Sequence, residues 1–110
     1  MVEASLLKLR SQPQPGGEAA VRSLFSGMAS GKPDYALMSD EVAKHIKNGL
    51  DLFHTDMSKA GEAESVRFTG VGPAGLDNYE LKTATYTVRF AIYLGTEGKI
   101  VATNFGPPQP

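Results

Sequence analysis

The spacing of apolar residues changes at Gly61, and this change is the strongest constraint that the sequence places on the fold. Before Gly61, apolar residues recur every three or four positions, as they do on one face of a helix. After Gly61 they alternate with polar residues, as they do on a half-buried strand. A chain of 110 residues with 41% hydrophobic and 21% charged residues has the size and composition of one globular domain. The sequence therefore predicts helices followed by strands around a single core.

Two amphipathic helices are predicted in the first half of the chain. The first spans residues 18–30, and the second begins after Ser39, whose hydroxyl is a favoured N-cap, and ends before Gly61. Residues 1–16 contain prolines and glycines among polar residues and are predicted to be an N-terminal tail or linker. The apolar positions that follow the helical period are Val21, Leu24, Phe25 and Met28 in the first helix, and Val42, Ile46, Leu50, Phe53 and Met57 in the second.

Four strands are predicted in the second half, over residues 64–71, 76–83, 85–94 and 99–105. The reversal near residues 83–85 lacks the usual turn residues, so the sequence leaves the register of that hairpin open. The expected fold class is α+β, with two N-terminal helices packed on one face of a curved four-stranded antiparallel meander over residues 17–106. Residues 107–110 are predicted to be a tail, because their prolines cannot continue a central strand.

Charge and composition exclude several classes of function. A net charge of −1, from 11 basic and 12 acidic residues, argues against binding nucleic acid or an anionic membrane. The chain has no cysteine, and no apolar stretch approaches the length of a membrane span. His45 and His54 are nine residues apart on one helix and point to opposite sides, so they cannot share a metal ion. We therefore predict no catalytic residue, no cofactor and no metal site.

The third predicted strand separates two candidate surfaces. Its even-numbered residues are apolar and are expected to face the helices, whereas Arg89, Ala91 and Tyr93 are expected to face solvent or a partner. With Thr103 and Phe105, these three residues form the predicted interface of a homodimer, in an amphiphilic patch that also includes Val101. The residues predicted to line a cavity between helices and sheet are Tyr35, Phe53, Phe68, Tyr79, Tyr86, Val88, Phe90 and Ile92.

Three segments carry a resemblance to a known family: FTGVGPAGLDNYEL at 68–81, GKI at 98–100 and PDYALMS at 33–39. Together they resemble a small bacterial module of the cystatin-like, nuclear transport factor two-like type, which is often appended to serine hydrolases of the β-lactamase type and to other envelope enzymes. The resemblance implies a conical cavity and pairing through the outer sheet face, and it carries over no catalytic residue. The sequence departs from the family pattern at residues 83–86 and lacks the tryptophan expected near residues 88–89.

The expected function is a non-catalytic accessory or ligand-binding module that binds a small apolar ligand or supports an adjoining enzyme domain, and that dimerises through its sheet. One alternative is a stand-alone enzyme of the ketosteroid isomerase or polyketide cyclase type, for which Asp34 and Asp56 are among the few candidate acids. Another is a purely structural interaction domain. In that case the cone is filled by Phe25, Phe53, Phe68 and Phe90.

The cellular location expected for the protein depends on whether the sequence is a whole chain or a domain of a longer one. As written, the chain lacks a leader sequence, which indicates the cytoplasm. A domain excised from a secreted or periplasmic parent has the same sequence features, so that location is the alternative.

Overall fold

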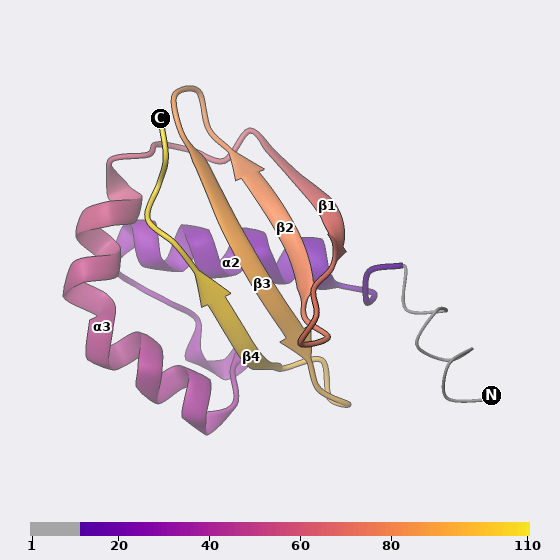
Figure 1. The fold of residues 1–110 in the computed structure, drawn as a ribbon. Coiled ribbons are helices and arrows are strands. Elements are labelled where there is room, and N and C mark those ends of the chain that lie inside the picture. Colours follow the sequence, from indigo (N-terminus) through magenta and orange to yellow (C-terminus); the bar gives the residue numbers. More distant parts are fainter. Residues whose placement is uncertain (1–11) are drawn as a thin grey trace.

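Both predicted helices and all four predicted strands are present in the structure, a computed structural model that describes residues 12–110 (Figure 1). The sheet is antiparallel with strand order β1-β2-β3-β4, so the predicted α+β meander is confirmed. Residues 1–11 of the predicted tail lie outside the described residues. The elements are α2 (Gly17–Ser30), the short 3-10 turn η1 (Tyr35–Leu37), α3 (Asp40–Ser58), β1 (Ser65–Val71), β2 (Asp77–Lys82), β3 (Thr87–Leu94) and β4 (Ile100–Phe105).

The helix ends follow the signals in the sequence. The Ser39 hydroxyl accepts a hydrogen bond from the backbone N–H of Val42 at 3.3 Å, which confirms Ser39 as the N-cap of α3. α2 ends at Gly31, which has a φ of 77° and donates its N–H to the carbonyl of Met28. The same carbonyl accepts a hydrogen bond from Nδ1 of His54 at 3.2 Å. His54 therefore joins α3 to the end of α2.

The helices cover one face of the sheet. In Figure 1, α2 crosses behind the strands, and α3 packs against α2 and β4. The other face of the sheet is turned toward the viewer, and none of the helices in residues 12–110 covers it. The core lies between the two layers, where the most deeply buried side chains are Val21, Leu24, Met28, Ile46, Met57, Leu81, Val88, Phe90, Ile92 and Ile100.

The β2–β3 hairpin is closed by a threonine side chain. Thr83 donates its N–H to the carbonyl of Tyr86 at 2.9 Å, and its hydroxyl accepts the N–H of Tyr86 at 3.0 Å. A hydroxyl bonded in this way replaces the glycine or asparagine of common hairpins. The register that follows pairs Lys82 with Thr87 and Tyr79 with Phe90.

The structure corrects the predicted orientation of β4. Thr103 pairs with Ile92 and Phe105 pairs with Phe90, so both lie on the helix-covered face and not on the outer face. The register shifts between Tyr93 and Leu94, because β4 contains an extra residue there, Val101. A bulge of this kind exchanges the two faces for every later residue. The prediction that Thr103 and Phe105 belong to the outer face was therefore wrong.

The segment before α2 is bound to the sheet through Gln14. Its side-chain amide donates to the carbonyl of Leu94 at 3.0 Å and accepts the N–H of Leu94 at 2.8 Å. Its backbone N–H donates to a carboxylate oxygen of Asp77 at 2.7 Å. Gln14 thus provides, at the end of β3, the hydrogen bonds that another strand would supply.

Candidate functional site on the exposed sheet face

The residues predicted to line a cavity are packed against the core. Tyr79, Val88, Phe90 and Ile92 are buried on the inner face, and the other four are half-buried around them. Phe105 fills the space beside them, with its ring centroid 4.9 Å from that of Phe53 and 5.6 Å from that of Phe90. Aromatic side chains therefore occupy this part of the space between helices and sheet.

The structure does not gather the three predicted cavity tyrosines at one point. Tyr35 packs under Lys47, whose ammonium lies 4.9 Å from the ring centroid. Tyr86 belongs to the hairpin closed by Thr83. Tyr79 is buried beside Phe68, with ring centroids 5.7 Å apart. Each tyrosine has a separate structural environment.

Among the described residues, Asp77 is the one carboxylate buried on the inner face, and it was not predicted there from the sequence. Asp77 has no exposed surface and accepts the N–H of Gln14. Asp77 is buried with Tyr79 and Leu81 because alternate residues of β2 share one face of the sheet. This alternation is the sequence signal that could have identified Asp77 as a buried residue. Burial, followed by the negative charges of Asp77 and Glu18, raises the pKa of Tyr79 above its ordinary value.

The two acids proposed for a cavity have other surroundings. Asp34 is exposed, and its side chain accepts the N–H of Ala36 at 3.2 Å at the start of η1. Asp56 lies 3.9 Å from the ammonium of Lys59 on α3. Neither contact belongs to the inner face of the sheet. Both carboxylates are accounted for by local turn and helix interactions.

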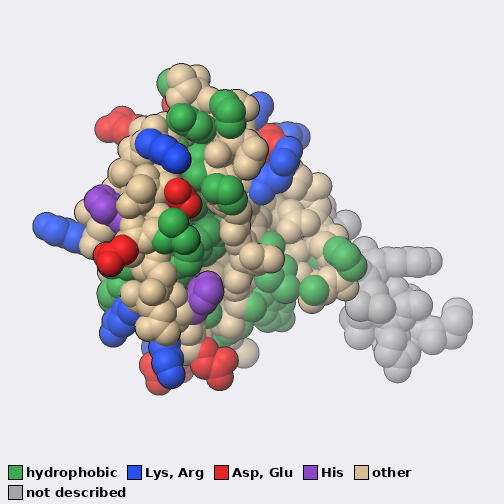
Figure 2. All heavy atoms as spheres, turned by 60° about the vertical axis from the view of Figure 1, so that its left-hand side comes forward, with side chains coloured by type: hydrophobic (Ala, Val, Ile, Leu, Met, Phe, Trp, Pro, Cys, Tyr) green, Lys and Arg blue, Asp and Glu red, His purple; other side chains and the backbone are tan. Residues whose placement is uncertain are grey.

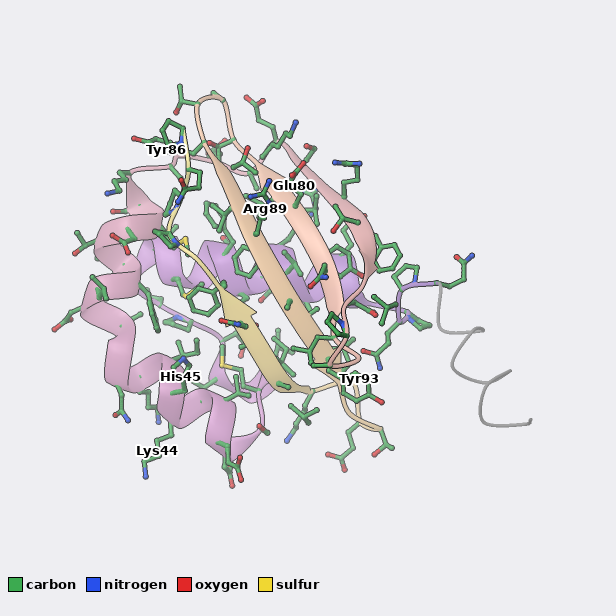
Figure 3. The ribbon with its side chains drawn as sticks, in the orientation of Figure 1. Lys44, His45, Glu80, Tyr86, Arg89 and Tyr93 are labelled. Atoms are coloured by element: carbon green, nitrogen blue, oxygen red, sulfur yellow. The ribbon has the colours of Figure 1, made fainter. Side chains whose placement is uncertain are left out.

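The outer face of the sheet begins with a row of charges across three strands. Arg67 of β1 pairs with Glu80 of β2, which pairs with Arg89 of β3. The guanidinium groups lie 3.0 Å and 3.5 Å from the Glu80 carboxylate, and the ammonium of Lys82 lies 4.0 Å from it. The side chain of Glu80 is only 14% exposed, whereas that of Arg89 is 76% exposed. Figure 3 shows Glu80 and Arg89 together on this face. We call these four residues the charged row.

The charged row holds Glu80 in its ionised form. The hydrogen bond from Arg67, assisted by the charges of Arg67, Lys82 and Arg89, lowers the pKa of Glu80 below its ordinary value. Three positive charges against one negative charge leave the row with a net charge of +2. The cationic groups are the exposed members, so an anion meets them first.

A row of amides lies next to the charged row. Asn78 of β2 and Asn104 of β4 are the register partners of Ala91 of β3, one on each side. Because alanine has only a methyl group, a hollow of about 370 Å³ opens here, which both asparagines and Arg89 line. Within the part of the chain that the structure describes, neither asparagine side chain forms a hydrogen bond. We call Asn78, Ala91 and Asn104 the amide row.

The far end of the same face is apolar. Tyr93 is 40% exposed and pairs with Ala102 of β4. These two residues line a second hollow, of about 480 Å³, with Ala74, Gly75 and Leu76 of the β1–β2 turn. In Figure 3, Tyr93 lies at the opposite end of β3 from Arg89. We call Tyr93, Ala102 and Leu76 the apolar row.

Three of the five residues predicted as an interface share the outer face. Arg89, Ala91 and Tyr93 lie there as expected and supply one member to each row. Sequence reasoning missed their neighbours Asn104 and Ala102, which the bulge at Val101 places on this face. It also missed Asn78, although strand alternation in β2 places it beside Glu80 on the same face.

The α3 side of the molecule has a different character. In Figure 2 its acidic and basic side chains are interspersed, with both histidines exposed among them. Residues 12–110 contain no group of three histidine, aspartate or glutamate side chains placed to hold a metal ion. The helices of this described range are all too short or too polar to cross a membrane.

Comparisons of the chain with family models, with curated proteins and with solved structures gave no match. The fold is a small α+β domain in which two helices precede a four-stranded meander. The resemblance to the cystatin-like, nuclear transport factor two-like modules stays a prediction from the sequence.

Proposed function

We propose that this chain is a non-catalytic accessory module that binds a partner protein through the exposed face of its sheet. One observation carries the proposal: the outer face presents charged, amide and apolar rows in order along β3, while the inner face is filled by the core. A mixed face of this kind, with exposed arginine and tyrosine, has the composition of a protein interface. The cystatin-like resemblance supports the accessory role beside an enzyme.

The packing of the inner face favours this function over the alternatives. A small apolar ligand needs volume between helices and sheet, where Phe53, Phe90 and Phe105 are in contact. An isomerase-like enzyme needs an acid that reaches its substrate, and Asp77 is fully covered and engaged with Gln14.

A second copy of the chain is the less favoured partner. A symmetric contact centred on the charged row brings two rows of net positive charge together. A homodimer that avoids this repulsion must be centred on the apolar row around Tyr93. Sedimentation velocity of the chain checks this point, and we expect a monomer.

Panning against a displayed library of random peptides of about twelve residues tests the proposed function. We expect the immobilised chain to enrich peptides whose binding is lost in Ala91→Trp, which fills the hollow between Asn78 and Asn104. The matched control is Ala29→Trp, a half-buried alanine on α2, at a site away from the sheet face. The proposal is overturned when no peptide is enriched, or when Ala91→Trp retains all the peptides that a folded Ala29→Trp variant binds.

A further inference from the structure

The three rows have a fixed spacing along one strand. Arg89, Ala91 and Tyr93 are alternate residues of β3, so their side chains share one face at intervals of about 7 Å. The charged and apolar rows are therefore about 13 Å apart, with the amide row midway between them. An extended segment lying along β3 has the same rise per residue. Its residues i, i+2 and i+4 face the three rows in turn.

Each row selects a different side chain. The charged row has an excess of two positive charges, and its arginines are 68% and 76% exposed, so it favours a carboxylate. The amide row offers donors and acceptors from Asn78 and Asn104 around the hollow above Ala91, which suits a polar side chain. The apolar row offers Tyr93 and the hollow beside it, which suits an aliphatic side chain.

We infer that the partner supplies an extended segment with a carboxylate, a polar residue and an aliphatic residue at three alternate positions, in either chain direction, bound along β3 with the carboxylate at the charged row and the aliphatic residue at the apolar row. The inference rests on the proposed function and names the chemistry of its partner. Charge complementarity at Arg67 and Arg89 selects this occupant over a second copy. A nucleic acid is disfavoured because the Glu80 carboxylate lies between the two arginines and the chain has a net charge of −1.

Four capped synthetic peptides test the spacing and the charge. The first has the sequence Gly-Glu-Ala-Gln-Ala-Leu-Gly, and the second is its reverse, because the rows do not fix the chain direction. The third replaces glutamate with glutamine. The fourth omits the alanine before leucine, so that leucine and glutamate point to opposite sides of an extended chain. Each peptide is titrated into the full chain labelled with ¹⁵N. The peptide concentration is raised to about 5 mM, because short peptides that bind weakly are detected only in that range.

We expect the first or second peptide to cause saturable shifts of the amide signals of Asn78, Arg89, Ala91 and Tyr93. Affinity falls by about tenfold for the third and fourth peptides and for the Arg89→Ala variant. Arg22→Ala is the matched control, because Arg22 is also exposed and also lies near a glutamate, Glu18, at 3.4 Å on α2. This control leaves affinity unchanged. Raising the salt concentration weakens binding, since the arginines are exposed.

Several outcomes overturn the inference. They are the absence of saturable shifts with both forward and reversed peptides, equal binding by the glutamine or shortened peptide, and equal binding by Arg89→Ala. Stronger shifts of the same signals by a single-stranded oligonucleotide of twelve thymidines or so assign the face to nucleic acid instead. Failure of this inference is distinguishable from failure of the proposed function. If panning enriches peptides whose binding depends on Ala91 but which lack the acidic–polar–aliphatic pattern, the proposed interaction module is retained and only this partner is excluded.

Discussion

The two faces of β3 are made by alternate residues of one short strand, yet they have opposite environments. Val88, Phe90 and Ile92 are buried against the helices, whereas Arg89 and Tyr93 are exposed on the other face. Burial of apolar side chains stabilises the fold, and exposed ion pairs contribute little to it. The comparison teaches that substitutions one residue apart separate the stability of the fold from the binding proposed for the outer face.

Truncation of Phe90 is expected to have the largest effect. The side chain is 2% exposed and packs against Phe105, so Phe90→Ala leaves a cavity in the core. We expect the free energy of unfolding, measured by urea denaturation, to fall by about 3 to 5 kcal/mol. Arg89→Ala is the neighbouring control on the outer face, and we expect a change within about 0.5 kcal/mol. Similar losses for the two variants would break the division between the faces.

The inner face of the sheet could be predicted from the sequence because its signal is local. The apolar alternation of β3 and the helical stripes of α2 and α3 each lie within one element. The structure confirms them, except that Leu50 and Phe53 of the α3 stripe are only half-buried. The N-cap at Ser39 was also legible, since a hydroxyl followed by acidic residues is a local pattern.

The outer face could be predicted only in part, because it depends on how strands are paired. Nothing in the run from Ile100 to Phe105 indicates that Val101 is an extra residue, and this bulge decides which side chains of β4 join Ala91 and Tyr93. The register of the hairpin at Thr83 was likewise hidden, because a side-chain hydroxyl replaced the usual turn residues. The charged row required the register of β1 against β2.

Removal of the buried carboxylate is expected to have the next largest effect. Asp77→Ala deprives the N–H of Gln14 of its acceptor on the inner face. We expect a loss of about 2 to 3 kcal/mol in the free energy of unfolding, as for hydrogen bonds to buried charged groups. The control is Asp56→Ala, whose carboxylate lies at 3.9 Å from Lys59 on the surface of α3. Equal, small effects of the two changes would show that Gln14 does not depend on Asp77.

A methyl group at Gly17 tests how tightly the inner face is packed where α2 begins. An alanine Cβ there meets the hydroxyl of Tyr79, and this clash outweighs the gain in helix propensity of about 1 kcal/mol. We expect Gly17→Ala to lower the free energy of unfolding by about 1 to 3 kcal/mol. Adding Tyr79→Phe removes the clashing oxygen and is expected to restore part of the loss. A double-mutant cycle with no coupling between the two substitutions contradicts this explanation.

Acidification tests the outer face, where the expected effect is smallest. The hydrogen bond from Arg67, with the charges around it, keeps the pKa of Glu80 below its ordinary value of 4.5. As the pH falls, the Glu80 carboxylate therefore becomes protonated in the unfolded chain at a higher pH than in the folded chain. The contribution of Glu80 to stability is present above the unfolded pKa and is lost as the pH falls through the folded pKa.

The measurement is urea denaturation of the native chain and of Glu80→Gln between neutral pH and about pH 3. We expect a small advantage of the native chain near neutrality that disappears at acid pH, because both side chains are then uncharged. Glu18→Gln is the control, because Glu18 forms an exposed ion pair with Arg22 on α2 at 3.4 Å, away from the sheet. A constant difference between native and Glu80→Gln chains would mean that the charged row does not act on the Glu80 carboxylate. The outer face would then be a set of independent surface charges, and the net positive charge of the charged row would no longer be fixed around Glu80.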